Sequence, residues 1–124
     1  MTELPVNKES KLLKNGPAKK LTIYVDENEK LHGKPVYEAI LDLLAQRKIA
    51  GASVFRGVAG YGSHGKLHTA KILELSTTLP VKIEVVDSEE MIKIIMAELT
   101  SVVAKGLIEV SDTMVIQCGE REKP

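Results

Sequence analysis

The chain has 124 residues, which is the size of one domain and too short for two. Lys+Arg and Asp+Glu balance at 17 each, so we do not expect the basic surface of a protein that coats nucleic acid. Cys118 is the only cysteine, no apolar run resembles a signal peptide, and none approaches the ~20 residues of a membrane span. These features predict a soluble, cytoplasmic protein, and a domain this small often gains stability by forming an oligomer.

The first half of the chain reads as a tail, a strand and a helix. Residues 1–19 are rich in Lys, Glu, Asn and Pro without a clean period, which is typical of a tail. Residues 21–25 alternate and are partly β-branched, so they predict a strand, followed by a charged loop at 26–34. Pro35 suits the first turn of a helix, and Gly51 ends that helix. Its apolar positions recur at helical spacing: Val36, Ile40, Leu43 and Leu44.

The second half repeats this pattern. Residues 52–56 predict a second strand, and residues 81–85 a third. Asp87 with Glu90 resembles a capping box that begins a second helix, and Gly106 ends it. The apolar stripe of that helix is Ile92, Ile95, Leu99, Val102 and Val103.

The last element predicts the fold class. Residues 107–110 and 114–118 are consistent with a final strand, bent near 111–112. The order β-α-β-β-α-β is that of an α+β, ferredoxin-like sandwich at residues 20–118, followed by a tail at 119–124. In this fold two helices cover one face of an antiparallel sheet, and the other face commonly packs against other subunits. Residues of mixed character are expected on that second face: Thr22, Tyr24, Lys82 and Glu84.

The connection between strands two and three, at residues 57–79, is longer than a hairpin needs, and such loops are usually functional or disordered. It begins with a glycine-rich run that also carries Arg56, His64 and Lys66. Glycines at positive φ let consecutive backbone N–H groups converge on a phosphate or carboxylate, and the flanking cations add charge. A solvated loop whose glycines only allow turns explains the same run about equally well.

Two sharper motifs overlap here. Residues 60–65 spell G-x-G-x-x-G with Asp87 about 22 residues further on, which approaches a dinucleotide fingerprint, and residues 60–66 spell G-x-x-x-x-G-K. A P-loop then needs Ser or Thr where this chain has Leu67, and a dinucleotide fold places its fingerprint after the first strand. Both matches are therefore weak.

Catalytic and metal chemistry find little support in the sequence. His64 and His68 are four residues apart, a spacing seen in metal sites, but no third ligand is evident. Cys118 has no partner motif and suits a small apolar strand position. Because no acid/base pair emerges, we do not expect an enzyme, a metal site or a required cofactor.

The chain resembles an uncharacterised bacterial family that is grouped with the PII-like signalling proteins. Four segments carry the resemblance, which spans about residues 21–117: VFRGVAGYG at 54–62, LHTAKILELS at 67–76, LPVKIEVVDSEE at 79–90 and KGLIEV at 105–110. PII proteins are trimers of ferredoxin-like subunits that bind adenine nucleotides between neighbours and signal through the long loop. The resemblance implies the same for this chain.

Site residues follow from the same resemblance. Gly60, Tyr61 and Gly62 are similar to the G-F-G-like run that opens the PII signalling loop, and Lys105 with Gly106 stands where PII proteins have a phosphate-binding turn. PII proteins also carry paired arginines after the last core strand, whereas this chain has only Arg121, so ADP or AMP fits at least as well as ATP. The expected ligand-binding residues are Arg56, Gly57, Gly60, Tyr61, Gly62, His64, Gly65, Lys66, Lys105 and Gly106.

The expected function is thus a trimeric regulatory protein that binds an adenine nucleotide, ADP above all. Its client protein is unknown; a membrane channel or transporter is conceivable because members of the family are sometimes associated with a fluoride-efflux channel. Two alternatives stay open: an enzyme that uses the glycine-rich loop for phosphate or dinucleotide chemistry, and a trimeric scaffold without a small ligand.

Overall fold

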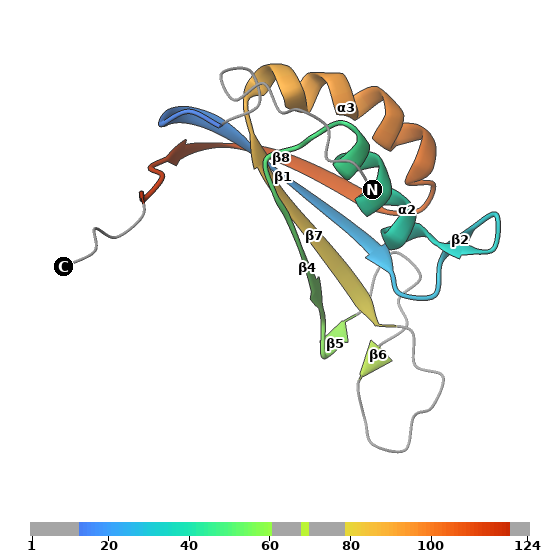
Figure 1. The fold of residues 1–124 in the computed structure, drawn as a ribbon. Coiled ribbons are helices and arrows are strands. Elements are labelled where there is room, and N and C mark those ends of the chain that lie inside the picture. Colours follow the sequence, from blue (N-terminus) through green and yellow to red (C-terminus); the bar gives the residue numbers. More distant parts are fainter. Residues whose placement is uncertain (1–12, 61–67, 70–78, 120–124) are drawn as a thin grey trace.

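The computed structural model describes residues 13–60 and 79–119 and the backbone of residues 68–69. Its main sheet has four strands: β1 (Gly16–Asp26), β4 (Ala52–Arg56), β7 (Pro80–Asp87) and β8 (Leu107–Val115). They follow the order β4-β7-β1-β8, and every neighbouring pair is antiparallel. The helices α2 (Val36–Gln46) and α3 (Glu89–Val102) both lie on one face of this sheet (Figure 1). The predicted ferredoxin-like α+β fold is confirmed.

The core lies between the sheet and the helices and is aliphatic, as the composition predicts. Alternate residues of β1 and β7 point toward the helices, and every fourth or third residue of each helix points back. The buried cluster consists of Leu21, Ile23, Val25, Val36, Ile40, Leu44, Val81, Ile83, Val85, Ile92, Ile95 and Leu99. Of the predicted helical stripes, Leu43, Val102 and Val103 are only partly buried and pack at the margin of this cluster. Within the described part of the chain, neither helix is long and apolar enough to cross a membrane.

The two outer elements of the chain are longer than expected. β1 begins at Gly16, so residues that the sequence placed in the N-terminal tail pair with the end of β8. β8 runs without a break through the Ser-Asp pair at 111–112, where a bend was predicted, and ends at Val115. The bend is wrong because Asp112 lies opposite Lys19 in the ladder and forms an ion pair with it. That hydrogen bond raises the pKa of Lys19.

A short hairpin replaces the loop predicted at 26–34. β2 (Lys30–Leu31) pairs with β3 (Lys34–Pro35). The two residues between them, His32 and Gly33, have φ values of 53° and 81°. Two successive positive φ angles are the requirement of a tight hairpin turn whose twist matches the strands, and glycine at the second position meets it without strain.

The N-cap of α3 is Ser88, not Asp87 as the capping-box reading predicted. The Ser88 hydroxyl accepts a hydrogen bond from the Met91 N–H at 3.2 Å. Asp87 is buried, and its carboxylate instead accepts from the N–H groups of Ala50 and Ser88 at 2.8 and 2.7 Å. It therefore ties the segment that enters β4 to the start of α3.

The face of the sheet away from the helices, here called the open face, carries rows of side chains from all four strands. Strand register places Phe55, Lys82, Tyr24 and Leu107 in one row. The Lys82 ammonium lies 5.0 Å from the centre of the Phe55 ring, a cation–π distance. Tyr24, Phe55 and Leu107 are 37%, 47% and 57% exposed, so three large side chains of the open face are accessible to solvent in one chain.

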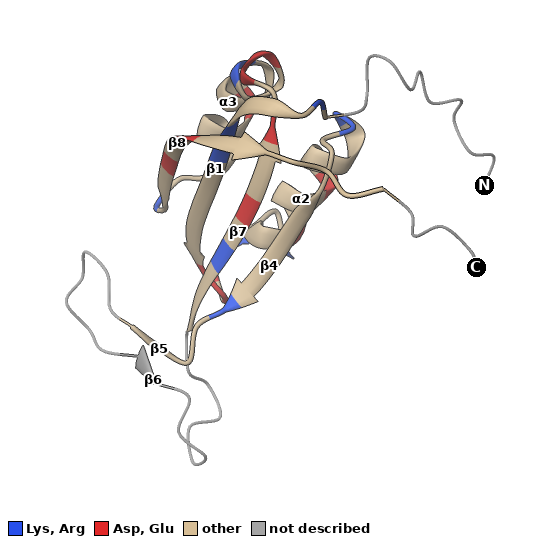
Figure 2. Ribbon diagram, turned by 90° about the vertical axis from the view of Figure 1, so that its left-hand side faces the viewer, with Lys and Arg blue, Asp and Glu red and all other residues tan. Residues whose placement is uncertain are grey.

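The next row of the open face is charged. Glu84 lies 3.1 Å from Lys82 and 3.4 Å from Lys20, so one carboxylate serves two ammonium groups along β7 and β1. Blue and red stretches accordingly follow each other along β7 (Figure 2). Hydrogen bonding from Lys82, with a further hydrogen bond and the charge of Lys20, lowers the pKa of Glu84 against the opposing effect of partial burial.

Glu84→Gln should lower the free energy of unfolding at neutral pH and have little effect in acid. The folded-state pKa of Glu84 is below its unfolded value, so its contribution is present above the ordinary carboxyl range near about pH 4 and is lost as the pH falls through the folded pKa. Urea unfolding between neutral pH and about pH 3 measures this. Glu109→Gln is the control, because Glu109 forms no ion pair with a described residue. If Glu84→Gln lowered the free energy of unfolding equally at every pH, the stabilisation could not come from the charge of Glu84.

Candidate functional site

The segments that the sequence singled out come together at one end of the sheet. β4 ends at Arg56 and β7 begins at Pro80, so both stems of the 57–79 connection lie at this end. β8 begins beside the last residues of β1, with Leu107 opposite Tyr24. The turn of Lys105 and Gly106, which precedes β8, therefore lies at the same end as the stems.

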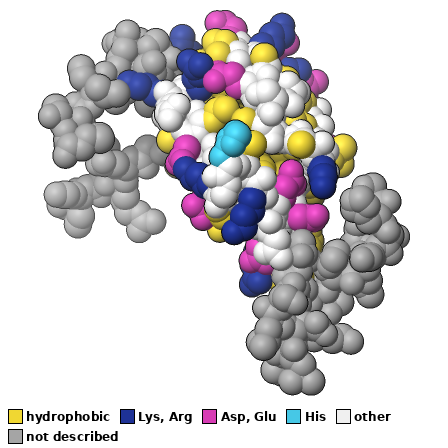
Figure 3. All heavy atoms as spheres, turned by 90° about the vertical axis from the view of Figure 1, so that its right-hand side faces the viewer, with side chains coloured by type: hydrophobic (Ala, Val, Ile, Leu, Met, Phe, Trp, Pro, Cys, Tyr) yellow, Lys and Arg dark blue, Asp and Glu magenta, His cyan; other side chains and the backbone are white. Residues whose placement is uncertain are grey.

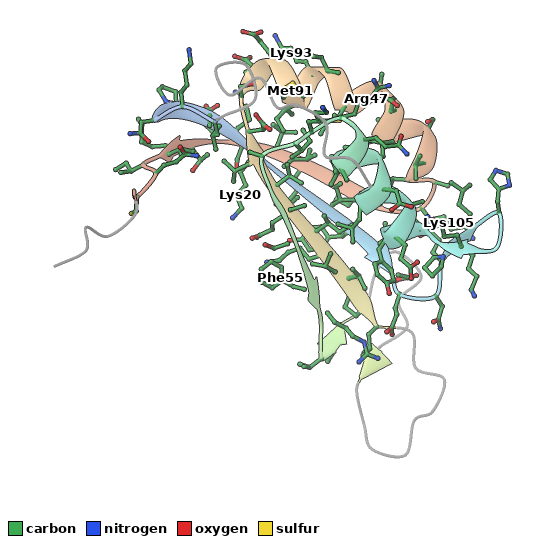
Figure 4. The ribbon with its side chains drawn as sticks, viewed as in Figure 1. Lys20, Arg47, Phe55, Met91, Lys93 and Lys105 are labelled. Atoms are coloured by element: carbon green, nitrogen blue, oxygen red, sulfur yellow. The ribbon has the colours of Figure 1, made fainter. Side chains whose placement is uncertain are left out.

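The two parts of the candidate site are nevertheless on opposite edges of the sheet. β7 and β1 separate β4 from β8, and three strand spacings amount to about 14 Å. Figure 4 shows Phe55 on the β4 side and Lys105 beyond the end of α3, on the other side. No single phosphate can contact both parts in one chain. The arrangement suits an extended ligand or a second copy that brings its own edge.

Arg56 is already paired. Its Nε lies 2.7 Å from Oε2 of Glu27, and its Nη2 donates to Oε1 of Glu27 at 3.1 Å, so the contact is bidentate. The Arg56 side chain is 59% exposed and that of Glu27 26%. Glu27 was not singled out in the sequence, because a carboxylate 29 residues before its partner leaves no local pattern.

Close packing against Pro80 requires a glycine at position 57 and leaves little room for a side chain at position 60. A Cβ on Gly57 would lie 2.7 Å from Pro80 Cγ, and one on Gly60 would lie 3.1 Å from the same atom. The Gly57 N–H donates to the Pro80 carbonyl at 2.7 Å, so this donor is not directed at a ligand. Among the described glycines, only Gly16 and Gly33 have positive φ. An anion nest of the kind expected from the glycine run would thus depend on residues beyond Gly60.

The turn before β8 combines a packing glycine with a free cation. A Cβ on Gly106 would lie 2.2 Å from the Tyr24 carbonyl oxygen and 2.7 Å from a Val103 methyl. Lys105 is exposed and forms no ion pair with any residue of the described ranges. Because Gly106 has no side chain, the turn after α3 can pass close to the backbone of β1. Lys105, the residue before it, is exposed to solvent.

The described residues on either side of positions 61–67 pair as two short strands. β5 (Ala59–Gly60) pairs with β6 (His68–Thr69), with Gly60 opposite His68. A P-loop or a dinucleotide fingerprint leads from a strand into a helix, so both motif readings are wrong. Five expected site residues lie outside the described part of the chain: Tyr61, Gly62, His64, Gly65 and Lys66.

Other chemistry gains no support from the described residues. They include no group of three or more His, Cys, Asp or Glu that could hold a metal ion. The face that carries the β2–β3 hairpin mixes basic and acidic side chains rather than gathering one sign of charge (Figure 3). Cys118, expected as an apolar strand residue, is exposed beyond the end of β8.

Comparison with known proteins gives consistent matches. The family model DUF190, described as "Uncharacterized ACR", matches residues 18–115. A UPF0166 protein of Aquifex aeolicus is 39% identical over 98 residues, which cover 79% of this chain and 92% of that protein. A UPF0166 protein of Methanocaldococcus jannaschii is 40% identical over 99 residues, covering 79% and 91%.

Solved structures with the same fold are PII-like. CPII of Thiomonas intermedia K12, solved bound to ADP and bicarbonate, has a TM-score of 0.62 and 23% identity, covering 84% of this chain and 93% of that one. A putative PII-like signaling protein of Thermus thermophilus has a TM-score of 0.59 and 17% identity, covering 81% and 90%. At these identities the likeness is one of fold.

Gly106→Ala should lower the free energy of unfolding by about 1–3 kcal/mol, because the nearest atom that the added methyl group meets is the backbone oxygen of Tyr24, which cannot move aside as a flexible side chain can. Gly51→Ala is the matched control, since nothing lies within 4 Å of a Cβ built there. Chemical denaturation of both variants measures the difference. Equal stabilities would show that Gly106 is not held by this close approach.

Proposed function

Since the chain belongs to the DUF190 family and has the PII-like fold, we propose that it is a regulatory protein that binds an adenine nucleotide at a seam between subunits. The observation that carries this proposal is the division of the candidate site between opposite edges of the sheet. In a ring of identical copies, the β4 edge of one subunit meets the β8 edge of the next. The stems of the 57–79 connection and the turn of Lys105 would then face one another across each seam.

The open face supports assembly. Tyr24, Phe55 and Leu107 are three large side chains of one row of the open face, in which Lys82 lies between Phe55 and Tyr24, and they remain exposed in one copy. Large apolar side chains grouped in this way usually mark a protein interface. The ion pairs of Glu84 with Lys20 and Lys82 neutralise this carboxylate, which lowers the cost of bringing two such faces together. A trimer in which the open faces turn inward satisfies both features.

The ligand is proposed to be ADP, with AMP and ATP as its competitors. CPII, which shares the fold, has been solved with ADP, AMP and bicarbonate. Among the described residues Lys105 has no ion-pair partner, and it lies at the same end of the sheet as the stems; Arg56 is a second cation on the opposite edge. Tyr61, Gly62, His64, Gly65 and Lys66 complete the proposed set, and Gly106 holds the turn of Lys105 in place.

Regulation would follow from the 57–79 connection. A nucleotide that prefers one arrangement of this connection shifts the population toward it, and a client protein reads the difference. The client is proposed to be another protein of the cytoplasm or a membrane channel or transporter. No turnover of the nucleotide is part of this proposal.

Lys105→Ala should weaken ADP binding about tenfold or more, because a charge-assisted hydrogen bond contributes about 1.5–3 kcal/mol. Gly62→Val should abolish binding while the domain stays folded. Lys93→Ala, which removes an exposed lysine on α3 that pairs only with Glu89 among the described residues, is the control and should bind as the wild type does. Calorimetric titration with ADP, AMP, ATP and bicarbonate measures all four proteins.

The same titrations separate the rival functions. Binding of none of these ligands by the wild type would favour the ligand-free scaffold, and hydrolysis of ATP would favour an enzyme. Wild-type affinity in both Lys105→Ala and Gly62→Val would contradict the proposed placement of the ligand.

Leu107→Glu should convert the oligomer into smaller species, because it places a charge among the large exposed side chains of the open face. Ile94→Glu is the matched control, since Ile94 is 54% exposed but lies on α3, in the helix layer. Sedimentation velocity gives the mass of each protein. A monomeric wild type, or a Leu107→Glu variant with the wild-type mass, would contradict assembly through the open face.

A further inference from the structure

Glu27 contacts both stems of the 57–79 connection. Its side chain holds Arg56, the last residue of β4, through two contacts of 2.7 and 3.1 Å. Its backbone N–H donates to the carbonyl of Leu79, the residue just before β7, at 2.8 Å. One residue in the turn after β1 therefore touches the chain where it leaves β4 and where it re-enters β7.

The side-chain contact occupies one of the two edges through which Arg56 can hold an anion. The Nε–Nη2 edge of a guanidinium presents two parallel N–H groups that match a carboxylate and a phosphate equally well. In this chain that edge is occupied by Glu27. A phosphate approaching Arg56 meets a donor pair already in use and a negative charge beside it.

We propose that Glu27 is a positioning residue that competes with the ligand for Arg56, so that an anionic ligand gains the Nε–Nη2 edge of Arg56 only by displacing the Glu27 carboxylate. This inference rests on the proposed nucleotide function and adds that Glu27 limits the affinity for the nucleotide. Displacing the Glu27 carboxylate costs little free energy, because both side chains are partly exposed and ion pairs of this kind contribute little to stability. The bond from the Glu27 N–H to Leu79 does not involve the carboxylate, so only the β4 stem loses a contact.

Glu27→Gln tests the competition, because glutamine keeps the size of the side chain and removes its charge. The affinity for ADP should rise about two- to fivefold, the range that a partly exposed ion pair allows. The double variant Glu27→Gln/Arg56→Gln should lose this gain, since the effect acts through Arg56. Glu29→Gln is the matched control: it removes a carboxylate from the same turn that forms no ion pair with a described residue.

Calorimetric titration of the four proteins with ADP gives distinguishable outcomes. A gain in affinity for ADP that is confined to Glu27→Gln supports the inference. Unchanged or weaker binding in Glu27→Gln, an equal gain in Glu29→Gln, or a gain that survives in the double variant would overturn it and leave the proposed function intact. Failure of the wild type and of Glu27→Gln to bind ADP would overturn the proposed function itself.

Discussion

The pairing of β1 with β7 on one side and β8 on the other is the constraint from which the other features follow. It puts the strand that carries much of the buried core at the centre of the sheet and leaves β4 and β8 as the edges. Because all pairs are antiparallel, the end of β4, the start of β7 and the start of β8 meet at one end. The same pairing divides the candidate site between two edges about 14 Å apart, which is why assembly and ligand binding are proposed together.

At this end of the sheet the glycines and the arginine have structural roles that do not depend on a ligand. Gly57 and Gly60 make room for the Pro80 ring, and Gly106 makes room for the backbone of Tyr24. Arg56 is held by Glu27. Packing and ion pairing thus hold the stems in place. A ligand that binds there must either keep these contacts or break them. Lys105 is a cation that such contacts leave free within the described ranges.

Much of the fold was predictable because it depends on local periodicity. Alternation in β1 and β7 and the helical stripes of α2 and α3 indicated the element order, and that order indicated the fold. Two of the failures were at positions decided by partners distant in sequence: Ser111 and Asp112 resemble a turn until β1 pairs with them, and Asp87 resembles a cap until the Ala50 N–H binds it. The candidate site was predictable only in part for the same reason, since neither Glu27 nor Pro80 carries a local motif.

The central claim is that the nucleotide binds where two subunits meet. A ligand held at such a seam binds the assembled form alone, so it must stabilise assembly by thermodynamic linkage. The most direct measurement is a dilution series by sedimentation velocity with and without ADP. ADP should move dissociation of the oligomer to lower protein concentration. An unchanged midpoint, with ADP still bound to dissociated subunits, would contradict the central claim.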